Sequence, residues 1–436
     1  MSTPIIDIND DFKNAINQME SSTNHLFITG RAGTGKSTLL QYFREMTHKK
    51  IAVLAPTGLA ALHVKGQTVH SFFGFPAYPI HSDDIRKRKD DKLYKNLDTI
   101  IIDEVSMLRA DVLDAIDYFM RINGKSRSLP FGGTQMIFIG DLFQLPPVIS
   151  SDIEKKLFTF LYETPYFFSS HVLRNAQLNY LELRKIYRQR DADFLNTLEK
   201  IRTKNIDYDQ LYTLNKARCR SFFKPPENEQ YITLTTTNQV AIKMNNQELD
   251  KINEPAFTFK ATIEGNIQEQ SYPNDPNLVL KEGAQVMFVR NDLYGRWVNG
   301  TIGRVTFVDQ DTLQVTITDD GIKKEYTVEK QEWEVLKYTW NDKNQKVTTE
   351  IMGTFTQYPI KLAWAITIHK SQGKTFDKVV VDLGYGAFAP GQVYVALSRC
   401  TTLEGLVLKK PIKLSDVQVD QRIVDFANKM ELYQLK

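Results

Sequence analysis

Cysteine is scarce in this chain of 436 residues, long apolar runs are lacking, and opposite charges nearly balance. The two cysteines, Cys219 and Cys400, lie far apart and match no zinc-ligand spacing, so we expect plain thiols and neither disulfides nor a metal cluster. No apolar run is long enough to cross a bilayer, and residues 1–7 lack the basic and apolar regions of a signal peptide. We therefore expect no membrane association and a cytoplasmic location. The net charge of +3 indicates nothing about nucleic-acid binding, which would need a local basic groove.

A glycine-rich segment near the N-terminus carries the clearest signal. Residues 30–37, GRAGTGKS, fit the pattern G-x-x-x-x-G-K-[ST] at every defined position. The segment follows the apolar run 26–28 and precedes apolar residues at helical spacing, so it lies between a strand and a helix, where free N–H groups and the helix dipole attract anions. Lys36 would neutralise the β and γ phosphates of a nucleotide, and the Ser37 hydroxyl would hold Mg²⁺. The residues predicted to surround the phosphates are Gly30, Gly33, Thr34, Gly35, Lys36, Ser37 and Thr38.

Polar residues follow three further apolar runs, and such strand ends gather at one edge of a parallel sheet. Run 99–102 leads into Asp103, which suits a second metal contact, and Glu104, which suits a water-activating base. Run 136–139 leads into Gly140-Asp141, followed by Gln144, whose amide could sense the γ-phosphate. A third run, 51–54, ends before Pro56, Thr57 and Gly58.

The charge that develops during phosphoryl transfer calls for a cation, and an arginine in that role contributes about 10³ to 10⁵ in rate. Arg188 and Arg399 are the candidates. From composition alone, either one is an ordinary surface arginine.

The segments taken together resemble one family. The order of these segments along the chain is similar to the order of the motifs in superfamily-one DNA helicases. The further segments that carry the resemblance are residues 140–147, Tyr187-Arg188-Gln189, 367–373 and 394–399. The stretch from Leu113-Asp114-Ala115 to residues 131–135 resembles the signature of the Pif-type branch, which is related to RecD.

That resemblance implies roles for individual residues. Arg188 and Arg399 would reach the γ-phosphate of ATP from a second RecA-like domain, Gln144 would be the coupling residue, and Gln372 with Gly373 would touch both nucleotide and DNA. DNA contacts are expected from Pro56, Thr57, Gly58, Thr367, His369 and Lys370. One position departs from the family: Phe12 stands where relatives carry a glutamine that reads adenine, so adenine selectivity is uncertain.

The fold class predicted is α/β, with two RecA-like motor domains. The first is expected over residues 1–175, and the second over 176–252 together with 355–436. Residues 253–354 hold short β-type runs separated by Gly, Asn and Asp, which predict an inserted small β-barrel.

An aromatic, proline-containing segment within residues 64–80 allows two interpretations. Its aromatics could form a stiff pin that stacks on bases, with Phe72 and Phe75 as DNA contacts, or they could fill a satellite core. His70 is a further DNA candidate, although a lone histidine is more often packed.

We expect an ATP- and Mg²⁺-dependent helicase that opens forked or structured DNA, as a monomer or weak DNA-dependent dimer, and the family resemblance implies 5′-to-3′ movement on single-stranded DNA. Two alternatives stay open: a translocase that displaces proteins without unwinding, and an ATP-gated DNA-binding switch.

Overall fold

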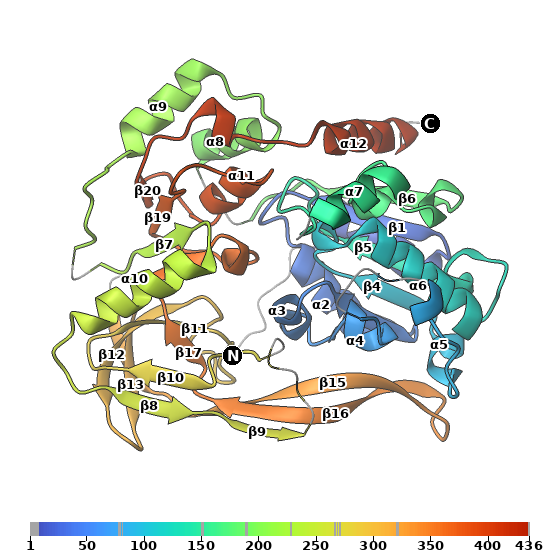
Figure 1. Ribbon diagram of the computed structural model, residues 1–436, viewed down its shortest axis with the longest axis horizontal. Coiled ribbons are helices and arrows are strands. Elements are labelled where there is room, and N and C mark those ends of the chain that lie inside the picture. The colour runs from blue at the N-terminus through green and yellow to red at the C-terminus, as the bar shows by residue number, and fades with distance from the viewer. Residues whose placement is uncertain are drawn as a thin grey trace.

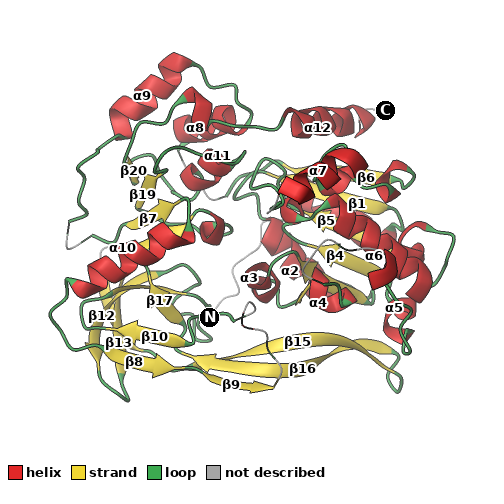
Figure 2. Ribbon diagram, in the orientation of Figure 1, coloured by secondary structure: helices red, strands yellow, loops and turns green. Residues whose placement is uncertain are grey.

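The computed structural model describes residues 8–76, 80, 82–149, 152–187, 191–226, 229–265, 267, 269, 272–319 and 322–434. Two parallel sheets flanked by helices and a mainly antiparallel β region make up these residues (Figures 1 and 2). The expected α/β class with inserted strands is confirmed.

The first motor domain is built on a six-stranded parallel sheet. Its strand order is β3 (Gln67–Thr68), β2 (Ile51–Ala55), β4 (Thr99–Ile102), β5 (Gln135–Ile139), β1 (His25–Gly30) and β6 (Leu178–Leu183). The helices are α1 (Asp10–Ser21), α2 (Lys36–Met46), α3 (Gly58–His63), α4 (Val69–Phe73), α5 (Lys92–Asn96), α6 (Ala110–Asn123) and α7 (Asp152–Leu161). Because strand side chains alternate, Leu26 and Ile28 pack in one core, and Phe27 packs in the core on the opposite face.

The predicted end of this domain at residue 175 is wrong. Strand β6 pairs with β1 along its whole length, from His25 opposite Leu178 to Gly30 opposite Leu183, so the first sheet continues to residue 183.

The second motor domain has a four-stranded parallel sheet with the order β18 (Ala365–Thr367), β7 (Ile232–Thr235), β19 (Val379–Asp382) and β20 (Leu406–Leu408). Its helices are α8 (Ala192–Arg202), α9 (Tyr208–Arg218), α10 (Asn238–Asp250) and α11 (Gln392–Leu397). Strand β7 comes from the earlier of the two predicted segments and the other strands from the later one, so both segments contribute to one sheet.

The last helix belongs elsewhere than predicted. Helix α12 (Gln421–Gln434) packs on the first motor domain, where Ile423 and Met430 join the core and Phe426 stacks on Phe168 with ring centroids 4.2 Å apart (Figure 1). The chain therefore returns to the first motor domain after it completes the second.

The β region has its own core. One sheet has the order β14 (Ile322–Thr327), β13 (Leu313–Asp319), β12 (Ile302–Val308), β11 (Gln285–Phe288) and β17 (Ile360–Leu362). A two-stranded sheet joins β10 (Asn277–Leu280) to β8 (Phe257–Lys260), and a three-stranded one joins β15 (Gln331–Asn341), β16 (Lys346–Gln357) and β9 (Thr262–Gly265). Since β16 and β17 run past residue 354, the predicted end of the insertion is too early.

The β15–β16 hairpin reaches the first motor domain, where Tyr338 lies in the core (Figure 1). The Val53 amide donates a hydrogen bond to its hydroxyl at 3.2 Å, and the Tyr338 amide donates to Gln67 Oε1 at 3.1 Å.

The aromatic segment belongs to the main core of the first motor domain, so it forms neither the predicted pin nor a separate satellite core. Phe72 and Phe75 are 5% and 8% exposed, and a side chain so covered is not available to stack on a base. The Phe73 and Phe75 rings stack at 5.2 Å, and Phe72 meets Tyr338 edge-on at 5.9 Å. Residues 77–79 of the predicted pin lie outside the described residues.

Both cysteines are free thiols, as expected. Within the described ranges, no helix is both long and apolar enough to cross a membrane.

Candidate active site

The phosphate-binding loop lies between β1 and α2, as predicted. Gly30, Gly33 and Gly35 have φ values of +155°, +84° and +87°, which other residues rarely adopt. A Cβ on Gly30 would lie 2.6 Å from Thr34 Oγ1, so only glycine fits there. The Lys36 ammonium donates to Gly30 O at 2.6 Å and to Arg31 O at 3.0 Å. Ser37 and Thr38 are exposed in the first turn of α2, where a phosphate and its metal would meet them.

Phe12 is a core residue beneath this loop. It is 2% exposed, and its ring lies 3.3 Å from the position that a Cβ of Gly35 would take. A side chain in that position cannot read a base. Tyr187, in contrast, is 42% exposed beside the same glycine, its amide donates to Gly33 O at 2.9 Å, and its hydroxyl accepts from Asn9 Nδ2 at 3.3 Å. The sequence pattern alone gives this ring no role, although it stands directly before Arg188 in the motif Tyr187-Arg188-Gln189.

Asp103 and Glu104 follow β4 at the sheet edge that holds the loop. Burial, and then the charge of Glu104, raise the pKa of Asp103 to about 7, while the charge of Lys36 opposes the shift. Glu104 has a left-handed φ of +51°, which is unusual outside glycine and typical of functional sites. Carboxylate and hydroxyl oxygens are the ligands that Mg²⁺ prefers, and a divalent cation bound at Asp103 would offset the repulsion between the two carboxylates. The residues present therefore fit Mg²⁺.

The second motor domain reaches this edge through Gln372. Its Nε2 donates to Gln144 Oε1 at 3.1 Å and to Glu104 Oε2 at 3.4 Å. The structure thus brings the predicted base and the predicted linking amide together on one side chain of the other domain. Gly391 of the second motor domain lies close to the segment that carries Gln144, since a Cβ on Gly391 would lie 2.4 Å from Gln144 O. Gly373 follows Gln372 with φ +77°.

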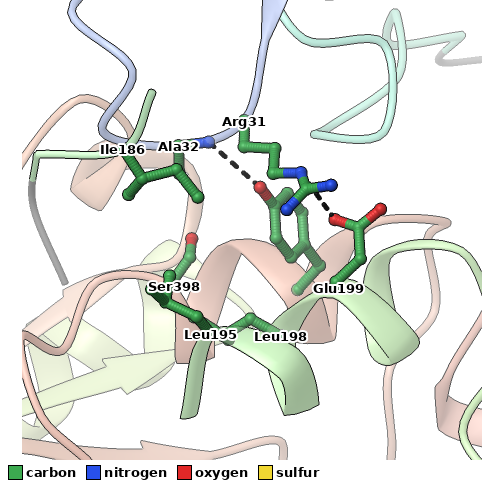
Figure 3. A pocket seen from close by; sticks show the side chains of 8 residues that line it. Arg31, Ala32, Ile186, Leu195, Leu198, Glu199 and Ser398 are labelled. Carbon is green, nitrogen blue, oxygen red and sulfur yellow. Dashed lines mark hydrogen bonds and ion pairs between the residues drawn. The ribbon is translucent and has the colours of Figure 1, made fainter. Parts of the chain in front are cut away.

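A second set of contacts joins the loop to the second motor domain. We call it the interdomain bridge, and its residues are Arg31, Ala32, Asp141, Glu199, Arg202 and Tyr394. Figure 3 shows Arg31 pointing toward Glu199 of α8, with Nε and Oε2 3.0 Å apart, and the Ala32 amide donating across the domain boundary.

Tyr394 and Arg202 hold the buried part of this bridge. The Tyr394 hydroxyl accepts from the Ala32 amide at 3.1 Å and donates to Asp141 Oδ2 at 3.3 Å. Arg202 Nη2 lies 3.3 Å from Asp141 Oδ1, and its guanidinium stacks 4.1 Å from the Phe143 ring centroid. Burial alone would lower the pKa of Arg202, but the charge of Asp141 and other groups outweighs burial and raises it. Arg202 therefore stays charged inside the interface.

Comparison with known proteins agrees with this arrangement. A family model for PIF1-like helicase matches residues 7–211. The ATP-dependent DNA helicase Pif1 of Bdellovibrio bacteriovorus is 32% identical over 419 residues, which cover 92% of this chain and 88% of that protein. This chain belongs to the PIF1-like helicases. Membership makes it an ATP-dependent DNA helicase, and so a nucleotide hydrolase.

Two solved structures resemble this PIF1-like helicase over nearly its full length. Bacteroides sp Pif1 in complex with ADP-AlF4 is 35% identical, with a TM-score of 0.89 and coverage of 98% of this chain and 97% of that one. Bacteroides Pif1 bound to ssDNA is also 35% identical, with a TM-score of 0.70 and coverage of 97% and 96%.

The two predicted arginines differ in what the structure says of them. Arg188 lies outside the described residues. Arg399 is 1% exposed, and its guanidinium donates to Val395 O at 3.0 Å, Lys374 O at 3.2 Å and Ser398 Oγ at 2.8 Å. These contacts place it inside the second motor domain, behind the Gln372 segment. A contact of either arginine with the γ-phosphate stays a prediction.

Six of the predicted DNA contacts in this PIF1-like helicase lie on two short segments. Pro56 and Thr57 join β2 to α3, which begins at Gly58, and Thr57 Oγ1 caps that helix by accepting from the Ala60 amide at 3.3 Å.

The other segment includes a short 3₁₀ turn over His369–Ser371, which exposes Lys370. Thr367 is 4% exposed and its hydroxyl accepts from the Lys370 amide at 3.2 Å, so its position does not support a direct DNA contact. His369 is half-buried.

His70 is half-buried in α4. Burial, and then the charge of Arg109, lower its pKa, which favours a neutral packed ring.

Proposed function

We propose that this PIF1-like helicase moves 5′ to 3′ along single-stranded DNA and separates duplex strands as ATP binding and hydrolysis close and reopen the contact between its motor domains. The observation that carries the proposal is the position of Gln372. Its amide touches Glu104 and Gln144 on the nucleotide side, and the exposed Lys370 is two residues away on the DNA side. One short segment therefore senses both ligands.

The hydrolysis chemistry follows from the groups at the sheet edge. The loop amides and Lys36 hold the β and γ phosphates, and Ser37 and Asp103 are the residues that would bind Mg²⁺. Mg²⁺ bound there neutralises phosphate charge. Glu104 takes a proton from a water molecule that Gln144 orients, the water oxygen bonds to the γ-phosphorus, and the bond from that phosphorus to the ADP oxygen breaks.

The base of the nucleotide is proposed to stack on Tyr187. The exposed Tyr187 ring beside Gly35 supports this proposal. The position at which relatives carry an adenine-reading glutamine is taken by the buried Phe12, which cannot contact the base. Stacking accepts any base, so selectivity for ATP over other nucleotides is expected to be weak.

Energy argues for ATP-driven movement rather than passive trapping. Opening one base-pair step costs on the order of 1.4 kcal/mol, so a few contacts could hold one open step but could not sustain progress along a duplex.

The expected partner is single-stranded DNA at forks or in structured DNA, in line with the ssDNA-bound relative. We expect a monomer or weak DNA-dependent dimer, located where its DNA lies, which is the cytoplasm in a bacterium. Sedimentation with and without forked DNA tests the assembly state.

The test of function uses duplexes that carry a single-stranded tail at either the 5′ or the 3′ end, with ATP and with Lys36→Ala as the hydrolysis-deficient control. We expect separation of the 5′-tailed duplex alone, and none by the control. Because Phe72 and Phe75 are buried, they supply no pin that would favour unwinding over simple translocation. Release of streptavidin from a biotinylated single strand without duplex separation would identify a translocase. Hydrolysis with neither activity would identify a switch.

A further inference from the structure

Four charged side chains of the interdomain bridge alternate in sign across the domain boundary. We call Arg31, Glu199, Arg202 and Asp141 the ionic chain. Arg31 Nε lies 3.0 Å from Glu199 Oε2 (Figure 3), and Glu199 Oε1 lies 3.4 Å from Arg202 Nη1. Arg202 Nη2 in turn lies 3.3 Å from Asp141 Oδ1. Since Glu199 and Arg202 lie on α8 of the second motor domain, the ionic chain leaves the first motor domain at one point and returns to it at another.

The two ends of the ionic chain join the nucleotide site at different places. Arg31 belongs to the phosphate-binding loop, and its carbonyl oxygen accepts a hydrogen bond from the Lys36 ammonium at 3.0 Å. Asp141 Oδ2 accepts from the Gln144 amide at 3.4 Å, and Gln144 also accepts from Gln372 of the second motor domain. Helix α8 is therefore linked both to the loop that holds the phosphates and to the amide proposed to orient the attacking water.

Apolar packing holds α8 against both ends of the ionic chain. Ala32 of the phosphate-binding loop and Leu145, which follows Gln144, are buried. Both belong to the core of the second motor domain, together with Leu198 of α8. Figure 3 shows Leu198 lining the same pocket as Arg31 and Ala32. Because protein interiors are close-packed, α8 and the loop either move together or separate completely. The ionic chain thus forms only while the two motor domains are in contact.

Glu199 is the place where the ionic chain can be cut without exposing a buried charge. The side chains of Arg31 and Glu199 are 40% and 27% exposed, whereas those of Arg202 and Asp141 are 8% and 0% exposed. Loss of the Glu199 carboxylate still leaves the buried Arg202 paired with Asp141. The first motor domain would then lose the ionic contact between its phosphate-binding loop and α8, while the inner pair stays intact.

We propose that the ionic chain makes the phosphate-binding loop sensitive to the γ-phosphate, with Glu199 as a positioning residue that favours ATP over ADP. The inference rests on the proposed function, in which ATP closes the motor domains and Gln144 acts at the γ-phosphate. ADP lacks that phosphate and gains nothing from closure. Contacts that hold the domains together therefore strengthen the binding of ATP and leave the binding of ADP unchanged.

The experiment measures dissociation constants of fluorescent AMP-PNP, a non-hydrolysable ATP analogue, and of fluorescent ADP, with Mg²⁺ present. Glu199→Gln keeps the shape of the side chain and removes its charge. We expect it to weaken AMP-PNP binding about 5- to 10-fold and to leave ADP binding unaltered. The matched control is Glu248→Gln, which breaks the exposed ion pair with Lys251 on the same motor domain. The control should match the wild type with both nucleotides.

A double-mutant cycle tests whether the two ends of the outer contact act together. Arg31→Gln should cause the same selective loss as Glu199→Gln, and the double variant should lose no more than either single variant, because both remove one contact. Additive losses would overturn the ionic chain. Thermal unfolding accompanies each titration. If Glu199→Gln is unstable, Arg31→Gln decides: a selective loss of AMP-PNP binding supports the inference, and unchanged AMP-PNP binding overturns it.

Two further outcomes overturn the inference in different ways. An equal loss of AMP-PNP and ADP binding would show that Glu199 only supports the structure of the loop. Unchanged binding of both nucleotides by a stable Glu199→Gln variant would refute the inference while the proposed function stands, provided that Gln144→Ala weakens AMP-PNP binding. If Gln144→Ala leaves AMP-PNP binding unaltered, the proposed action of Gln144 at the γ-phosphate fails, and this inference fails with it.

Discussion

Tyr394→Phe removes a single oxygen atom from the interdomain bridge, and its effect can be worked out from the contacts. The hydroxyl accepts from the Ala32 amide and donates to Asp141, and these residues are 6% and 1% exposed. In this variant Asp141 keeps Arg202 and Gln144 as partners, but the Ala32 amide loses its acceptor, the Tyr394 hydroxyl. A buried donor left unsatisfied costs about 1–3 kcal/mol.

That cost falls on the closed arrangement alone, because water can satisfy the amide once the domains part. The equilibrium should therefore shift toward the open form by about 5- to 150-fold. DNA-stimulated ATP hydrolysis should fall accordingly, and dyes placed on the two motor domains should report a greater mean separation by energy transfer.

Tyr385→Phe is the matched control, since it deletes the same atom from a fully exposed side chain of the second motor domain. Equal behaviour of the two variants in both hydrolysis and energy transfer would show that the bridge does not hold the domains together.

Three further changes have definite expected outcomes. Glu104→Gln keeps the shape of the side chain but removes the base, so ATP should bind while turnover falls by about 10² or more; near-normal turnover would place the base elsewhere. Phe75→Ala should lower the free energy of unfolding by about 3–5 kcal/mol in urea titrations because of the cavity it leaves. A selective loss of strand separation at unchanged stability would instead support the interpretation of this segment as a pin. Burial lowers the pKa of His25 to about 4, so the folded state resists a proton that the unfolded chain accepts. The free energy of unfolding should be highest above about pH 6.5 and fall by up to about 3 kcal/mol toward pH 4. His25→Asn should reduce this fall, and a pH profile of the variant identical to that of the wild type would contradict the prediction.

Much of the nucleotide site could be predicted because its information is local. The loop from Gly30 to Ser37 and the carboxylates after β4 each follow directly from a strand, and parallel strands end at one edge by geometry alone. The approach of Gln372 to these groups is implied only by the resemblance to superfamily-one helicases.

Interactions between distant segments could not be predicted in this way. The apolar pattern of residues 178–183 indicates a strand but not which sheet receives it. Phe72 is covered in part by Tyr338, which arrives on a hairpin from the inserted β region. Glu199 and Arg202 lie on a helix without any motif, and only their partners across the interface reveal their role.

Helix α12 has one more consequence for how such a motor can move. The polypeptide crosses between the motor domains once between β6 and α8 and again between β20 and α12, which is anchored by Phe426 and its neighbours. Two covalent connections limit how far the motor domains can move apart, because each connecting segment reaches no farther than its extended length. Figure 1 shows the second crossing along the top of the view and the β15–β16 hairpin along the bottom. Tyr338 of that hairpin also lies in the core of the first motor domain, so ties at the top and at the bottom of the view together restrict how far the two motor domains can part.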